Sequence, residues 1–234
     1  MPRLLVHVEG ETEETFVNEI LADHLYASGY ELVGARLLGN ARLRERRGGI
    51  RPWSTVKRDI LRHLKEDVGC VATTMVDYYG LPRTGEKAWS GRAEAGTLPF
   101  VQKAACVEGA LFADVALTLG GEYEARRFVP FVVMHEFEGL LFSSCDAFAD
   151  GIGRQELAQP FRDIRRQFAT PEEIDDSPVT APSKRVEGLV EGYEKPLHGC
   201  LAVLAIGLDT IRTECPHFRD WLTRLEKWPQ QHER

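Results

Sequence analysis

Residues 4–13 read LLVHVEGETE, and this stretch decides how the chain begins to fold. The apolar run 4–8 is typical of a buried strand, and a helical pattern begins near Thr12, just beyond Gly10. A strand that ends in a glutamate and a glycine and turns straight into a helix is a common place for a site, because open α/β sheets hold ligands at the carboxyl ends of their strands. We therefore asked which other side chains reach that edge.

Strand and helix patterns alternate over the first half of the chain. We expect strands at 4–8, 31–38, 68–76 and 128–134, and helices at 12–27, 53–66 and 98–117. This order predicts an α/β fold: a Rossmann-like, doubly wound, mostly parallel sheet flanked by helices. Beyond residue 154 only helical patterns occur, at 155–168, 183–193, 196–206 and 217–228. We expect an α/β domain over 1–150 and a helical C-terminal extension, 151–234, packed on it.

Composition indicates an ordinary globular protein, with 43% hydrophobic and 28% charged residues. No apolar run reaches the ~18 residues of a membrane span, so we expect a cytoplasmic protein without membrane contact. The five cysteines are odd in number and scattered, which argues against a disulfide framework. His198 with Cys200 and Cys215 with His217 suggest a zinc site, but each pair is closer in sequence than zinc ligands usually are. We favour core cysteines.

Basic residues are concentrated in one segment of an otherwise acidic chain. The net charge is −7, yet residues 36–58 carry eight basic residues and a single acid. Such a segment is a candidate phosphate-contacting surface, and a solvated loop is the alternative. The residues that we expect to contact nucleic acid are Arg42, Arg44, Arg46, Arg47 and Arg51.

Carboxylates follow three of the four expected strands. Glu9 follows the first, Asp77 the third, and Glu136 and Glu138 the fourth, while Glu13 lies one turn into the first helix. In a parallel sheet these ends share one edge, so the acids meet in one crevice and repel unless a cation lies among them. Carboxylates suit Mg²⁺ or Mn²⁺ and metal-assisted phosphoryl chemistry. If a helix begins near residue 135, only one of the two later glutamates faces the crevice.

Several of these motifs resemble those of Toprim domains. Residues 8–13 (VEGETE) are similar to the first Toprim motif, especially in OLD-type and RloB-type nucleases. Residues 75–80 (MVDYYG) stand where Toprim domains carry Asp-x-Asp, and 135–141 (HEFEGLL) resemble a later segment of RloB-like proteins. The whole chain also resembles an uncharacterised bacterial Toprim-like family often encoded beside ATPases, which shares PSKR at 182–185 and Tyr-x-Lys at 193–195.

The resemblance implies roles for individual residues. Glu9 matches the Toprim glutamate that is a metal ligand or general acid/base, and Glu13, Asp77 and Glu138 match acidic ligand positions. Tyr79 departs from the pattern, because it replaces the second aspartate and puts a second metal in doubt; Glu136 or Glu138 is a possible substitute. Lys184 and Lys195 are either solvated helix charges or catalytic cations beside the phosphate.

These observations lead to a hypothesis of a Mg²⁺-dependent Toprim-like nuclease that cleaves DNA or RNA. The resemblance implies a role in bacterial anti-phage defence with a partner ATPase of the ABC or AAA type. No Walker-type phosphate loop occurs in the sequence, so ATP hydrolysis would belong to that partner. The alternative is a catalytically degenerate Toprim-fold subunit that binds the ATPase or nucleic acid. The sequence leaves the substrate, DNA or RNA such as tRNA, and a possible homodimer undecided.

Overall fold

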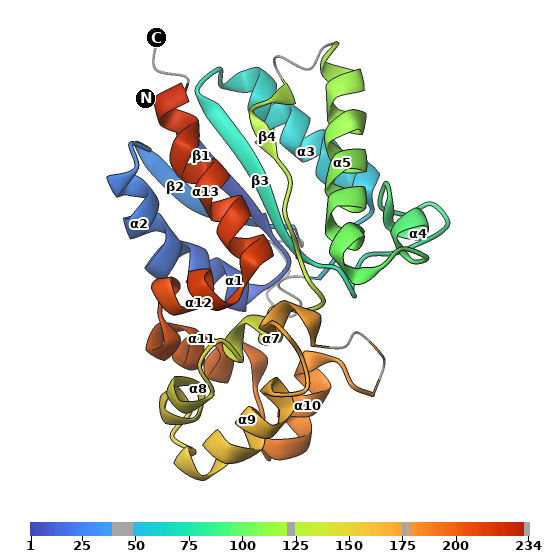
Figure 1. Cartoon of the computed structure of the whole chain (residues 1–234). Helices are drawn as coiled ribbons and strands as arrows, with labels where there is room; N and C mark the ends of the chain where they lie inside the picture. The colour runs from blue at the N-terminus through green and yellow to red at the C-terminus, as the bar shows by residue number, and fades with distance from the viewer. Residues whose placement is uncertain (39–48, 121–124, 175–176, 178, 232–234) are drawn as a thin grey trace.

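The computed structural model describes residues 1–38, 49–120, 125–174, 177 and 179–231 (Figure 1). The described strands are β1 (Arg3–Val8), β2 (Leu32–Leu37), β3 (Cys70–Asp77), β4 (Phe128–Val129) and β5 (Val132–Val133). They lie in the order β2-β1-β3-β4, with β5 also paired to β3, and every pairing is parallel. The predicted α/β class, a mostly parallel sheet flanked by helices with a helical C-terminal region, is confirmed.

Helices connect the strands and make up the C-terminal third. Those before β4 are α1 (Glu11–Phe16), the π-helical segment η1 (Val17–Leu21), α2 (Ala22–Ala27), α3 (Trp53–Glu66), α4 (Arg92–Ala95) and α5 (Phe100–Leu119). Those after β5 are α7 (Glu138–Leu141), α8 (Cys145–Gly151), η2 (Gln155–Leu157), α9 (Ala158–Arg165), η3 (Pro171–Glu173), α10 (Pro182–Leu189), α11 (Lys195–Ile206), α12 (Leu208–Glu214) and α13 (Pro216–Gln231). No described helix is long and apolar enough to cross a membrane.

Strand β3 is buried on both faces, as its apolar sequence predicts. Successive side chains of a strand point to opposite faces. Val71 and Met75 therefore pack in the core beneath α1, α2 and α13, whereas Ala72 and Val76 pack in the core beneath α3 and α5. Figure 1 shows these two helical layers on either side of the sheet. The carboxyl end of β3 is consequently fixed from both sides.

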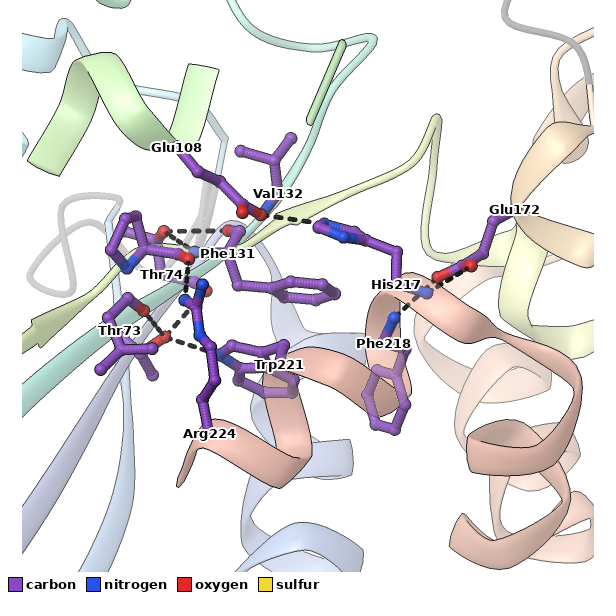
Figure 2. A network of polar contacts seen from close by, with 12 residues as sticks. Thr73, Thr74, Glu108, Phe131, Val132, Glu172, His217, Phe218, Trp221 and Arg224 are labelled. Carbon is purple, nitrogen blue, oxygen red and sulfur yellow. Dashed lines mark hydrogen bonds and ion pairs between the residues drawn. The ribbon is translucent and has the colours of Figure 1, made fainter. Parts of the chain in front are cut away.

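The fourth predicted strand is two short strands rather than one. Pro130 has no N–H to donate to a sheet and separates β4 from β5. The hydroxyl of Thr74 bridges the break, since it accepts a hydrogen bond from Phe131 N at 3.0 Å and donates one to Phe131 O at 2.9 Å (Figure 2). A side chain of β3 thus supplies the bonds that a regular ladder would make. The strand still ends at the predicted edge.

Helix α13 is anchored directly on the sheet. The Trp221 ring stacks on Phe131 with 4.3 Å between centroids, and its Nε1 donates to Thr73 Oγ1 at 2.9 Å (Figure 2). Both carboxylate oxygens of the buried Glu172 accept hydrogen bonds, from the backbone N of His217 and of Phe218, each at 2.9 Å. One hydrophobic core extends from β1 to α13, so the predicted extension beyond residue 150 shares its core with the sheet.

Candidate functional site

A pocket of about 320 Å³ lies at the carboxyl ends of β1 and β3. Helices α7 to α11 gather beyond this edge of the sheet (Figure 1). The charged residues lining the pocket come from four segments of the chain: Glu9, Glu11 and Glu13 from β1–α1, Asp77 from β3, Glu138 from α7 and Lys195 from α11. The structure therefore brings together four of the five predicted metal ligands and one of the two predicted lysines.

The carboxylates in this pocket are held largely out of water. Glu13 and Glu138 are 6% and 4% exposed. Asp77 is fixed by a hydrogen bond of 2.9 Å that its Oδ1 accepts from Phe137 N. The Oε2 atoms of Glu9 and Glu138 are buried and have no hydrogen-bond partner among the described residues. Buried carboxylate oxygens without a donor are costly, and either a proton or a positively charged ligand would relieve that cost.

Burial raises the pKa of Glu9, Glu13, Asp77 and Glu138 above the ordinary value of each group. For Asp77, repulsion from Glu9, Glu13 and Glu138 raises the pKa further. The pKa of Glu13 rises to about 7, because its burial is reinforced by the charges of Glu9 and Glu138. Perturbed carboxyl groups in a cleft are typical of functional sites. The pocket is therefore a cluster of acids whose protonated forms are favoured over their charged forms.

Lys195 is the cation that the described residues supply to this cluster. Its Nζ lies 2.9 Å from Glu138 Oε1, with 46% of the lysine side chain and 5% of the glutamate side chain exposed. Burial alone would lower the pKa of Lys195, but Glu138 and Asp77 outweigh it and raise that pKa. The lysine is therefore charged at neutral pH and points one donor group at the pocket.

Close packing of α11 against α1 determines where Lys195 lies. Gly199 is one turn beyond Lys195, and a Cβ atom there would lie only 2.8 Å from Thr12 Cγ2. Glycine is needed because any side chain would push the two helices apart. Nearer the acids, a Cβ at Gly80 would lie 3.3 Å from Glu9 Oε2, so a side chain there would make a tight contact with that carboxylate. Neither glycine was anticipated from the sequence, since each close contact joins segments that are distant along the chain.

Three predicted residues lie elsewhere or make other contacts. Glu136 is buried, and its Oε2 accepts a hydrogen bond of 2.8 Å from Ser183 N at the start of α10, so it stabilises that helix and does not line the pocket. Lys184 forms an exposed ion pair of 2.6 Å with Glu187 on α10. Tyr79, which we expected at the position of the second aspartate of the Toprim motif, is 38% exposed.

Of the predicted nucleic-acid residues, only Arg51 is described. It is partly buried, and its carbonyl accepts a hydrogen bond of 2.8 Å from Trp89 Nε1. Arg42, Arg44, Arg46 and Arg47 lie outside the described residues. The segment that carries them is flanked by Leu38 and Gly49, whose amides donate to Val8 O at 3.0 Å and Glu9 O at 2.8 Å. Both flanks are thus joined to the end of β1.

The alternative zinc site is not assembled. Cys215 Sγ lies 3.3 Å from Ser143 Oγ, His217 pairs with Glu108, and the His198 ring stacks on Tyr193. Across the described residues, no three His, Cys, Asp or Glu side chains are grouped so that they could hold a metal ion. This also applies to the acid cluster: its carboxylates line one pocket without converging on one point.

Comparison with known proteins places the chain in a family. A family model described as "Domain of unknown function (DUF4276)" matches residues 8–226, nearly the whole chain. The chain belongs to this family. No curated protein and no solved structure matches it. The family has no assigned activity, so functional inference rests on the pocket of this DUF4276 member.

Proposed function

We propose that this DUF4276 protein is a divalent-cation-dependent phosphodiester hydrolase that cleaves DNA or RNA. One observation carries the proposal: five acids from three segments line a single pocket, and two of them, Glu9 and Glu138, have buried oxygens without a hydrogen-bond donor among the described residues. Like charges so arranged are stabilised by a cation. The resemblance of residues 8–13 and 75–80 to Toprim motifs supports the same chemistry.

The donor chemistry of the pocket fits Mg²⁺ or Mn²⁺, because hard divalent cations prefer carboxylate oxygens. Glu9, Asp77 and Glu138 would hold the ion, and Glu13 lines the same pocket. The bound ion would supply positive charge and a water of lowered pKa for attack on a phosphate. Since the carboxylates do not yet converge, binding requires side-chain rotation and a weaker Lys195–Glu138 ion pair.

The protein's own residues have distinct parts in this proposal. Lys195, charged and half exposed at the pocket, would stabilise the negative charge that develops on the phosphate. Glu9, whose pKa burial raises in the metal-free protein, would release its proton when the ion binds, because a metal ligand must be deprotonated. Phe137 N keeps the Asp77 carboxylate oriented. Leu38 and Gly49, which flank the basic segment, donate to the carbonyls of Val8 and Glu9, and the arginines between them would contact the nucleic-acid backbone.

A nuclease assay with matched variants tests the proposal. Purified protein is incubated with single- and double-stranded DNA and RNA in Mg²⁺, Mn²⁺ or EDTA. We expect cleavage that needs the metal, is lost in Glu9→Gln and Asp77→Asn, and persists in Glu19→Gln, an exposed acid on η1. Cleavage that survives in both pocket variants would refute the assignment of the site.

The two lysines provide a second matched comparison. Lys195→Met should lower the cleavage rate about 100-fold, the usual loss when a group that stabilises transition-state charge is removed. Lys184→Met should leave the rate unchanged, because Lys184 pairs with Glu187 on the surface of α10. Equal effects of the two substitutions would show that Lys195 has no special role.

A non-catalytic subunit is the second candidate, and two observations favour it: Tyr79 replaces an expected aspartate, and Lys195 already pairs with Glu138. Mn²⁺ binding measured by calorimetry separates the candidates without an activity assay. Binding that Asp77→Asn abolishes supports the hydrolase, whereas no binding to the wild-type protein supports the subunit.

The biological setting follows from the resemblance and is part of the proposal. The protein would act in the bacterial cytoplasm, in anti-phage defence, with an ABC- or AAA-type ATPase as partner and a homodimer as a possible assembly. Co-expression with an ATPase encoded beside it, followed by size-exclusion chromatography, tests the partnership. Separate elution of the two proteins, with and without ATP, would contradict it.

A further inference from the structure

A second and larger pocket, of about 760 Å³, lies between α5, β4 and α13. It shares no lining residue with the acid cluster. Its volume is within the range of small-molecule sites in proteins, about 300–1,000 Å³. Nothing in the proposed hydrolase chemistry uses this pocket.

The inner surface of this pocket is apolar and aromatic. Phe128, Val129 and Pro130 contribute from the edge of the sheet, Phe112 from α5, and Trp228 from α13. The indole Nε1 of Trp228 donates to the carbonyl of Arg126 at 3.3 Å, which fixes the ring beside the pocket. Two aromatic side chains on different helices suit a planar ring, which gains stacking energy from either.

Three cations accompany the aromatic surface. Arg126, Arg224 and Lys227 are exposed, line the pocket, and form no ion pair with any other described residue. Arg224 is held in place by a hydrogen bond of 3.1 Å from its Nη2 to Pro130 O (Figure 2). A protein with a net charge of −7 thus gathers three cations at one pocket, none of them in an ion pair with the part of the chain that the structure describes. Guanidinium and ammonium groups so placed are complementary to a phosphate.

One acid lines the same pocket. Glu108 is 8% exposed, and its Oε1 accepts hydrogen bonds from Val132 N at 3.0 Å and from His217 Nε2 at 2.9 Å (Figure 2). Its second oxygen, Oε2, makes no hydrogen bond within the described part of the chain. A fixed carboxylate oxygen at an aromatic pocket recognises an N–H donor, such as the exocyclic amino group of a base.

We propose that this pocket binds a purine nucleoside 5′-phosphate whose base carries an amino group. The ring would lie between Phe112 and Trp228, the amino group would donate to Glu108, and the phosphate would contact Arg126, Arg224 and Lys227. An acidic peptide would satisfy the cations but leave the planar aromatic surface and the acceptor unused. The site is independent of the acid cluster and of its proposed hydrolase activity.

Isothermal titration calorimetry with AMP, GMP and IMP tests the proposal on the full chain. We expect a Kd for AMP or GMP below about 1 mM, and binding of IMP weaker by about tenfold because hypoxanthine lacks the amino group. Arg126→Glu combined with Lys227→Glu should weaken AMP binding at least about tenfold, since hydrogen bonds to charged groups are lost. The control, Arg219→Glu, changes an exposed arginine of α13 that does not line the pocket and should bind AMP normally.

A substitution at the acceptor tests the orientation of the base. Glu108→Gln should reduce the preference for AMP over IMP. A far-UV circular dichroism spectrum of the variant that matches the wild-type spectrum verifies that the variant is folded. Three outcomes would overturn the proposal: no binding of AMP or GMP up to about 10 mM, equal binding of AMP and IMP by the wild type, or AMP binding that survives the double substitution. Tighter binding of an acidic peptide than of AMP would also overturn it.

Discussion

Replacing Glu13 by glutamine should make the metal-free protein more stable at alkaline pH. Glu13 is 6% exposed, and its burial, with the charges of Glu9 and Glu138, raises its pKa from 4.5 to about 7. At about 1.4 kcal/mol for each pKa unit, the ionised side chain costs the folded state about 3 kcal/mol. Glutamine keeps the size of the side chain and removes the charge. Part of the gain is lost with the backbone hydrogen bond of the carboxylate, so we expect a net gain of about 1–2 kcal/mol.

The sign of the pH dependence follows from the direction of the shift. A folded-state pKa above the unfolded value means that the folded protein binds the proton more tightly. The stabilisation from Glu13 is therefore fully present below pH 4.5 and is lost as the pH rises to about 7. The wild type and Glu13→Gln should differ little near pH 4.5 and differ most above pH 7.

Urea unfolding in EDTA, followed by tryptophan fluorescence at pH 4.5 and pH 8, measures this difference. The control is Glu19→Gln, which removes an exposed charge from η1, six residues after Glu13, and should change stability by less than about 0.5 kcal/mol. A Glu13→Gln variant that is less stable than wild type at pH 8, or whose difference from wild type is the same at both pH values, would refute the electrostatic account of the pocket.

Further predictions concern packing, helix anchoring and a histidine. Gly199→Ala should lower the free energy of unfolding by about 1–3 kcal/mol, because its Cβ would lie 2.8 Å from a side chain of α1. In Gly188→Ala, by contrast, the Cβ meets open space, so equal losses in chemical denaturation would contradict the packing argument. Glu172→Ala should cost about 2 kcal/mol, since two backbone N–H groups at the start of α13 lose their acceptor. Glu173→Ala, a change at the next residue, is the control. Equal melting temperatures of Glu172→Ala and Glu173→Ala in thermal unfolding would contradict this prediction. For His217, burial alone lowers the pKa but Glu108 outweighs it and raises the pKa. Its stabilisation should be complete below pH 6.5 and decline as the pH rises through the folded-state pKa, and an NMR titration midpoint below 6.5 would contradict this.

The acid cluster illustrates a trade between stability and function. Burying several carboxylates near one another destabilises the folded protein. The raised pKa values of Asp77 and Glu13 show that their charged forms are disfavoured in the folded state. Destabilising groups of this kind are retained in proteins when they serve a function. A bound cation would remove the repulsion between the carboxylates. On this reasoning, added Mn²⁺ should raise the melting temperature of the wild-type protein more than that of Glu13→Gln. An equal rise in both would indicate that the ion binds elsewhere.

The sequence by itself determined the sheet and the edge at which the acids meet. Apolar periodicity is local, so the pattern of residues 4–13 and of β3 was sufficient to place Glu9 and Asp77 after parallel strands. The same local reasoning missed the break at Pro130 within the fourth strand, because the Thr74 hydroxyl that bridges it comes from another strand.

Only the tertiary structure decided which charged side chains share the pocket. Glu136 and Glu138 are equivalent in sequence terms, yet Glu136 binds the start of α10 whereas Glu138 faces Lys195. Lys184 and Lys195 are likewise separated by the way α11 packs on α1 at Gly199. These distinctions depend on contacts between segments far apart in the chain, and hydrophobic periodicity carries no information about such contacts. The stretch VEGETE therefore supplies Glu9 and Glu13 on one side of the pocket, and tertiary packing brings Glu138 and Lys195 to it.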